Sequence, residues 1–159
     1  MSTSPERQIA PIREEPRREL SLVGLSGTFT GPQGIPELWQ KFAPYLGKIP
    51  GQIGRVTYGI NFIPRPGSNE FEYMAAVEVA DFAGVPKELK QVVIPGQTYQ
   101  IFQHQEHVSG FSSTIRKIMN SGYIKPAPEG QVGLIEYYGE RFDPKSGFGD
   151  MEIWVPIRP

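Results

Sequence analysis

Hydrophobic and polar residues alternate in several short runs along this 159-residue chain, and this alternation is typical of β-strands. Residues 56–63 and 71–79 alternate most regularly, and the segment PRPGSN between them predicts a hairpin connection. Residues 19–30 form a third strand candidate. Residues 92–105 form a fourth, which a Pro-Gly pair interrupts.

Two other segments carry apolar residues at helical spacing. Residues 35–46 place them at i, i+3, i+4, i+7 and i+11, and Pro36 suits the first turn of a helix. Residues 107–120 follow the same period and end at a Ser-Gly pair. Residues 131–159 then predict a closing hairpin, so the chain reads strand, helix, strand, strand, given twice.

A constant offset between similar segments indicates an internal duplication. Moving the chain by 80 residues aligns Tyr58 with Tyr138 and Pro64 with Pro144, and it also aligns the apolar positions of the two predicted helices. The interpretation is a tandem duplication: two copies of one unit of strands and a helix, packed as a pseudo-dimer about an approximate two-fold axis. Residues 19–79 should superpose on residues 99–159.

The domain boundaries follow from the same pattern. We expect one domain over residues 19–159, built from repeats at about 19–79 and 92–159. Residues 1–18 are rich in proline and charge and poor in apolar side chains, so they predict a flexible leader.

Composition excludes several classes of protein. The charges nearly balance, at 16 basic and 17 acidic residues, so the chain lacks the basic excess of a nucleic-acid-binding protein. It has no cysteine, which excludes disulfides, thiolate zinc sites and a cysteine nucleophile. No apolar run is long enough to cross a membrane, and no signal-peptide core is present, which predicts a cytoplasmic protein.

Metal and cofactor sites are not predicted. His104, Glu106 and His107 lie close in sequence, but they straddle a junction between strand and helix without a further ligand cluster. Serines in the second helical segment lack the glycine-rich turn of a serine nucleophile, so no catalytic residue is assigned.

The two copies differ at an informative place. At the 80-residue offset, Glu136 falls opposite Val56 and Glu140 opposite Ile60, so acids replace apolar residues in the second copy. A carboxylate on a covered sheet face costs several kcal/mol unless it is paired, hydrogen-bonded or protonated. Glu136 therefore indicates either a binding site or a solvated face. Glu140 lies nearer the loop, where solvation is expected.

Three motifs carry a resemblance to a known family: IPGQTYQIFQH at residues 94–104, IEYY at 135–138 and MEIWVPI at 151–157. With them the chain resembles the GyrI-like effector-binding family, which includes ligand domains of AraC-type and multidrug-sensing transcription regulators. The resemblance implies an α+β fold, in which a tandem βαββ duplication forms one antiparallel sheet with two helices, an SHS2-type pseudo-dimer. It also implies that Glu136 faces cationic, lipophilic ligands in an aromatic pocket to which Tyr138 and Trp154 contribute.

The expected function is binding of cationic, lipophilic or aromatic small molecules, for sensing or sequestration. Trp39, Tyr58 and Phe111 could supply further walls, although each also suits plain core packing. No DNA-binding region precedes the domain in this sequence, so a standalone member without direct nucleic-acid contact is expected. Two alternatives stay open from the resemblance: a hydrolase that uses Glu136 to activate water against strained electrophiles, and a protein partner such as gyrase.

Overall fold

The computed structural model describes residues 9–158. Its regular elements follow the predicted order with one additional strand, β1, and the fourth strand candidate is divided at its Pro-Gly pair into β5 and β6. They are β1 (Arg13–Arg17), β2 (Leu20–Phe29), α1 (Ile35–Phe42), β3 (Gln52–Phe62), β4 (Phe71–Val79), β5 (Lys90–Ile94), β6 (Gln97–His104), α2 (Phe111–Asn120), β7 (Val132–Tyr138) and β8 (Met151–Pro156). Short 3-10 helices continue α1 at Ala43–Tyr45 and precede α2 at Val108–Gly110.

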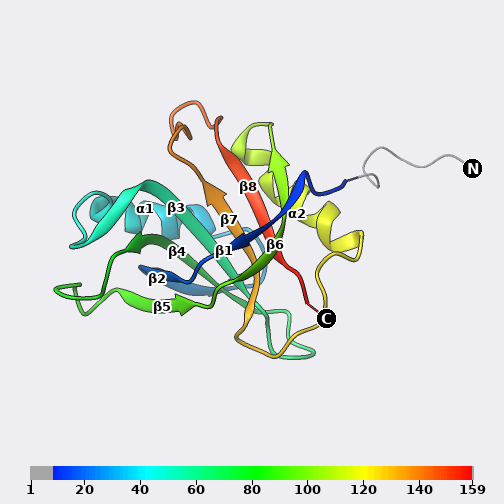
Figure 1. Cartoon of the computed structure of the whole chain (residues 1–159), viewed down its shortest axis with the longest axis horizontal. Helices are drawn as coiled ribbons and strands as arrows, with labels where there is room; N and C mark the ends of the chain where they lie inside the picture. The colour runs from blue at the N-terminus through cyan, green and yellow to red at the C-terminus, as the bar shows by residue number, and fades with distance from the viewer. Residues whose placement is uncertain (1–8, 159) are drawn as a thin grey trace, which may run out of the picture.

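All eight strands form one antiparallel sheet in the order β1-β6-β8-β7-β3-β4-β2-β5 (Figure 1). The unit β2-α1-β3-β4 recurs as β6-α2-β7-β8, and the two copies meet where β3 pairs with β7 at the centre of the sheet. The predicted α+β fold, a tandem βαββ duplication with two helices, is therefore confirmed.

The outer strands are exchanged between the two copies, and this exchange curls the sheet. β1 precedes the first copy but pairs with β6 of the second, whereas β5 precedes the second copy and pairs with β2 of the first. Only Arg18 and Glu19 join β1 to β2, although these strands lie near opposite ends of the strand order. The two ends of the sheet must therefore approach each other, and a Cβ at Gly96 would lie 3.3 Å from the carbonyl oxygen of Arg17.

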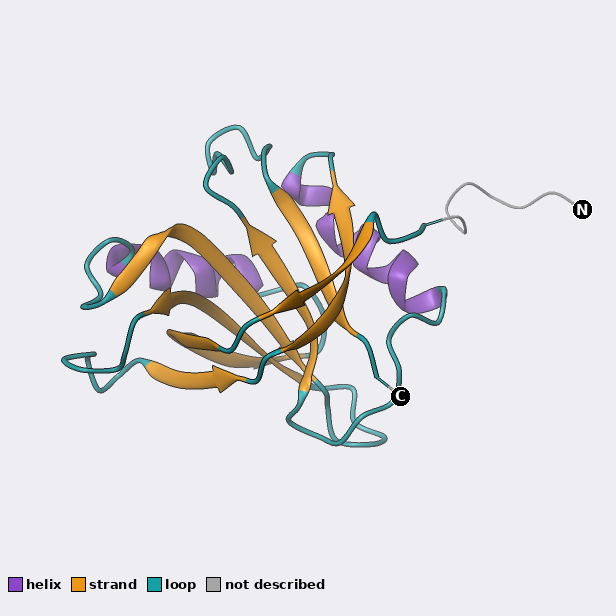
Figure 2. Cartoon of the chain, in the orientation of Figure 1, coloured by secondary structure: helices purple, strands orange, loops and turns teal. Residues whose placement is uncertain are grey.

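The curled sheet is covered on both faces. The inner face holds a core that includes Leu22, Ile60 and Trp154, all buried. On the outer face, α1 packs over the first copy through Leu38 and Phe42. The second helix, α2, packs over the second copy, with Ile118 buried. Figure 2 shows the two helices outside the curled strands.

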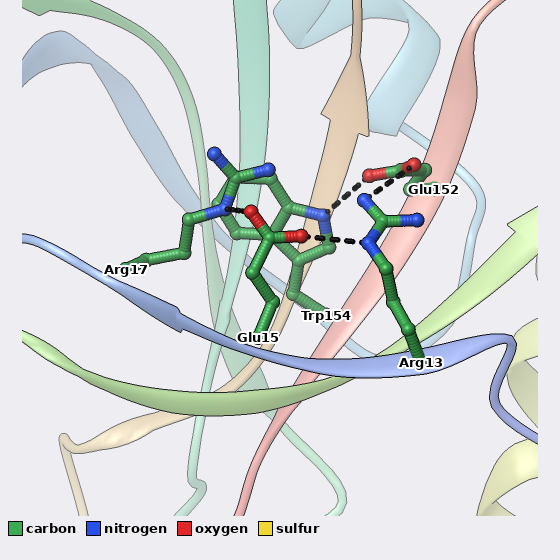
Figure 3. Close-up of polar contacts among 5 residues, drawn as sticks. All are labelled: Arg13, Glu15, Arg17, Glu152 and Trp154. Carbon is green, nitrogen blue, oxygen red and sulfur yellow. Dashed lines mark hydrogen bonds and ion pairs between the residues drawn. The ribbon is translucent and has the colours of Figure 1, made fainter.

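The prediction of a flexible leader is corrected for part of its length. Residues 1–8 lie outside the described residues, but residues 13–17 form the edge strand β1. Its side chains form a row of ion pairs: Glu15 lies 2.6 Å from Arg13 and 3.3 Å from Arg17, and Arg13 lies 3.2 Å from Glu152 (Figure 3). Charged side chains suit an edge strand, so composition alone did not separate this strand from a disordered segment.

The repeat offset is also corrected, from 80 to 79 residues in most of the strands. Leu20 pairs with Ile94, and the equivalent pair in the other copy is Tyr99 with Glu15, so each residue has its counterpart 79 positions away. A one-residue difference in a strand exchanges the two faces of the sheet. The counterpart of Glu136 is therefore Thr57 rather than Val56.

Candidate functional site

A cavity of about 770 Å³ lies on the outer face of the sheet, between α1 and α2 and over the central strands β3 and β7. Its walls are mostly apolar. Four of the six predicted site residues line it: Trp39 from α1, Phe111 from α2, and Glu136 and Tyr138 from β7. The junction of the two copies therefore holds the cavity, and both helices contribute walls.

Glu136 is buried, with 7% of its surface exposed, and three neutral groups donate hydrogen bonds to its carboxylate. The hydroxyls of Tyr73 and Tyr138 donate to Oε1 at 2.8 and 2.9 Å, and the amide of Asn61 donates to Oε2 at 3.1 Å. The indole N–H of Trp39 donates in turn to the Tyr73 hydroxyl at 2.9 Å. These groups hold the carboxylate in one orientation without neutralising its charge.

The pKa values follow from this environment. Burial raises the pKa of Glu136 above its ordinary value, and the hydrogen bonds from Tyr73, Asn61 and Tyr138 oppose the increase. Burial, together with the nearby charge of Glu136, raises the pKa of Tyr73 and of Tyr138 well above the usual range. Both phenols therefore stay protonated at neutral pH and remain hydrogen-bond donors.

The carboxylate fits because one residue beneath it has no side chain. Gly59 pairs with Glu136 across the β3–β7 ladder. A Cβ at this position would lie 2.2 Å from the Tyr73 hydroxyl and 2.6 Å from Oε1 of Glu136. Sequence reasoning missed Gly59, Asn61 and Tyr73, although a glycine inside a strand signals close approach of another group.

Aromatic contacts fix the walls on either side of the carboxylate. The ring of Tyr138 makes edge contacts with Trp39 at 5.6 Å and with Phe111 at 5.3 Å between ring centres. The imidazole of His104 stacks on the ring of Phe111, with 5.0 Å between the ring centres. The same imidazole forms a hydrogen bond with the hydroxyl of Thr114 at 2.8 Å. The cavity walls are therefore held by packing behind them as well as by the sheet.

Tyr58 and Trp154, the other two predicted site residues, lie on the inner face of the sheet. Tyr58 pairs with Tyr137, and residues paired in an antiparallel ladder share a face, so Tyr58 points away from Glu136. Trp154 is 1% exposed and stacks on Tyr137 at 5.1 Å. The guanidinium of Arg17 lies over its ring at 4.5 Å. The expectation that Tyr58 and Trp154 line the same pocket as Glu136 is therefore corrected. Both belong to the core on the inner face of the sheet, and neither lines the cavity on the outer face.

Other kinds of site were sought in the part of the chain that the structure describes. Over residues 9–158, no three His, Cys, Asp or Glu side chains come together as metal ligands. Within the same residues, no helix has the length and apolarity that a membrane span requires.

The fold and the cavity together define a small-molecule-binding domain. The chain belongs to the GyrI-like family: the model of the GyrI-like small molecule binding domain matches residues 10–158. The transcriptional regulator BrlR of Pseudomonas aeruginosa is 28% identical over 148 residues, which cover 89% of this chain and 53% of BrlR. The chain therefore spans about half the length of this curated relative.

Several solved structures share the fold, among them two that the match covers over more than 90% of their length. One is SAV2435 bound to tetraphenylphosphonium, with a TM-score of 0.71, 21% identity, and coverage of 92% of this chain and 93% of that one. The other is a putative transcription regulation protein from Staphylococcus aureus MU50, with a TM-score of 0.65, 20% identity, and coverage of 92% and 97%. At these identities the likeness establishes the fold.

Proposed function

We propose that the domain binds lipophilic cations in the cavity between α1 and α2, with Glu136 providing the charge selectivity. The observation that carries the proposal is a buried carboxylate without a cationic partner. Its three hydrogen-bond donors are neutral, and no lysine, arginine or histidine within residues 9–158 forms an ion pair with it. A buried charge without a counter-ion is unfavourable, and a bound cation would supply one.

The cavity wall suits the rest of such a ligand. Aromatic faces attract cations by about 0.5–2 kcal/mol per ring, and Trp39, Phe111 and Tyr138 all border the cavity. Apolar walls also remove the hydrocarbon surface of the ligand from water. The complex of SAV2435 with tetraphenylphosphonium, in a protein of the same fold, supports this ligand class. Micromolar affinity, about −8 kcal/mol, is the expected range.

Calorimetry with two ions of almost equal size and shape tests the proposal. Tetraphenylphosphonium and tetraphenylborate present the same four phenyl rings but opposite charges. The cation should bind in the micromolar range, and the anion should bind at least about tenfold more weakly, a difference of 1.4 kcal/mol. Equal affinities would mean that only apolar area is recognised, and the electrostatic role of Glu136 would be abandoned.

A further inference from the structure

The α2 side of the cavity carries two parallel stripes of different chemistry. Both stripes follow the spacing i, i+3, i+7 and i+11, which keeps residues on one side of a helix. The apolar stripe consists of Val108, Phe111, Ile115 and Met119, and the polar stripe of Ser109, Ser112, Arg116 and Asn120; all eight line the cavity.

The α1 side has no such polar stripe. The lining residues in and next to this helix are Gly31, Pro32, Ile35, Pro36 and Trp39, and Trp39 already uses its indole N–H on Tyr73. Although the fold is duplicated, its two helices therefore present unequal walls. Hydrogen-bonding side chains on the helices gather on α2, around Arg116.

Arg116 and Glu136 differ both in charge and in burial. The side chain of Arg116 is exposed, whereas Glu136 lies buried in the sheet, so the cavity has a positive group at its surface and a negative group at its floor. Across residues 9–158, Arg116 has no ion pair with an aspartate or glutamate. A guanidinium beside a cation site repels a simple cation, but it attracts a ligand that also carries an anionic group.

We propose that Arg116 selects amphoteric ligands: molecules with a lipophilic cation that lies toward Glu136 and a carboxylate that reaches Arg116. The planar guanidinium can bind a carboxylate through two parallel hydrogen bonds. Ser112 and Asn120, one turn away on either side, offer further polar contacts. The inference rests on the proposed function, since Glu136 fixes which end of the ligand lies deep.

The test uses two phosphonium ions that differ only in the charge of their tail. (4-Carboxybutyl)triphenylphosphonium is zwitterionic at neutral pH, and its methyl ester is a simple cation. The ratio of their affinities is measured by calorimetry in the wild type, in Arg116→Ala and in Lys117→Ala. Lys117 is the matched control, because it lies next to Arg116 on α2 but does not line the cavity.

In Arg116→Ala, the affinity of the carboxylate relative to the ester should fall about three- to fivefold, the size expected for an exposed ion pair. Ester binding should stay level or strengthen, and Lys117→Ala should leave the ratio unchanged. Arg116→Glu should lower the ratio further, and high salt should reduce the wild-type ratio. A ratio that is the same in the wild type and Arg116→Ala overturns the inference while leaving the proposed function intact. Absence of ester binding, or ester binding unaffected by Glu136→Gln, overturns both.

Discussion

Replacing Glu136 by glutamine separates the charge of this side chain from its shape. The amide oxygen of the glutamine can still accept from the hydroxyls of Tyr73 and Tyr138. Its amino group would face the amide of Asn61, which can rotate so that its oxygen accepts. The hydrogen-bond network therefore survives, and the substitution deletes essentially one buried negative charge.

The expected loss of cation affinity follows from Coulomb's law. A cation about 6 Å from the carboxylate interacts by about 3 kcal/mol at an effective dielectric constant of about 20. Glutamine retains a dipole, and water that enters the empty cavity weakens the interaction further. We expect tetraphenylphosphonium affinity to fall by at least about tenfold, or 1.4 kcal/mol.

The stability of the empty protein should change in the opposite direction. Burial raises the folded-state pKa of Glu136, so its stabilising contribution is complete below the unfolded pKa and is lost as pH rises through the folded pKa. At neutral pH the wild-type carboxylate is therefore unfavourable for folding. The melting temperature of Glu136→Gln should equal or exceed that of the wild type there, and the two should converge in acid. As pH rises through the folded-state pKa of Glu136, the carboxyl group gains its negative charge, so the cation affinity of the wild type should increase. The cation affinity of Glu136→Gln should not change over this pH interval.

Glu140→Gln is the matched control. Glu140 is exposed beyond the end of the same strand, and its carboxylate accepts from the backbone N–H of Arg55 at 2.8 Å. The substitution removes the same formal charge outside the cavity, so calorimetry should detect little change in cation affinity. If Glu136→Gln lowers the melting temperature sharply and leaves cation binding intact, Glu136 is a structural acid and the proposed site is misplaced.

Three further substitutions test neighbouring parts of the site. Gly59→Ala places a methyl group against Tyr73 and Glu136, so denaturant unfolding should show a loss of about 1–3 kcal/mol, together with weaker tetraphenylphosphonium binding. Tyr73→Phe removes a hydrogen bond that lowers the pKa of Glu136, so the pH at which cation affinity reaches half its maximum should move upward. Trp154→Phe should lower the free energy of unfolding by about 1–3 kcal/mol, because the indole ring fills the inner core. Cation affinity should stay within about twofold of the wild type. A large loss of affinity would mean that Trp154 does contribute to the site.

Much of the fold could be predicted because hydrophobic period and turn residues are local signals. They located both helices and the main strands within a few residues, and the recurrence of strand, helix, strand, strand predicted the duplication. The edge strand β1 was missed because its signal is not local. Its polar residues form a strand only where β6 offers free hydrogen-bonding groups and Glu152 offers a partner for Arg13.

The site was predicted in part for a similar reason. Glu136 stood out as an acid within an apolar strand, and Tyr138, two residues away, shares its face. Tyr58 was named as a possible wall that also suits core packing, and the structure places it in the inner core, because it pairs with Tyr137 and not with Glu136. Tyr73 could not be found from sequence, because its alternating strand matched an ordinary buried face and its hydroxyl meets Glu136 only across β3.

The duplication explains why a charged site can exist at the centre of this fold. Two copies related by an approximate two-fold axis place the same strand of each copy side by side, and the cavity lies over this junction, lined by residues of both helices. The equivalent positions there are Thr57 and Glu136, and Gly59 and Tyr138. At these positions the second copy has the carboxylate and the Tyr138 phenol, while Gly59 of the first copy leaves the space that the carboxylate needs. Substitutions that made the copies alike would either crowd this junction or remove its charge, so the proposed cation site depends on the asymmetry between the copies.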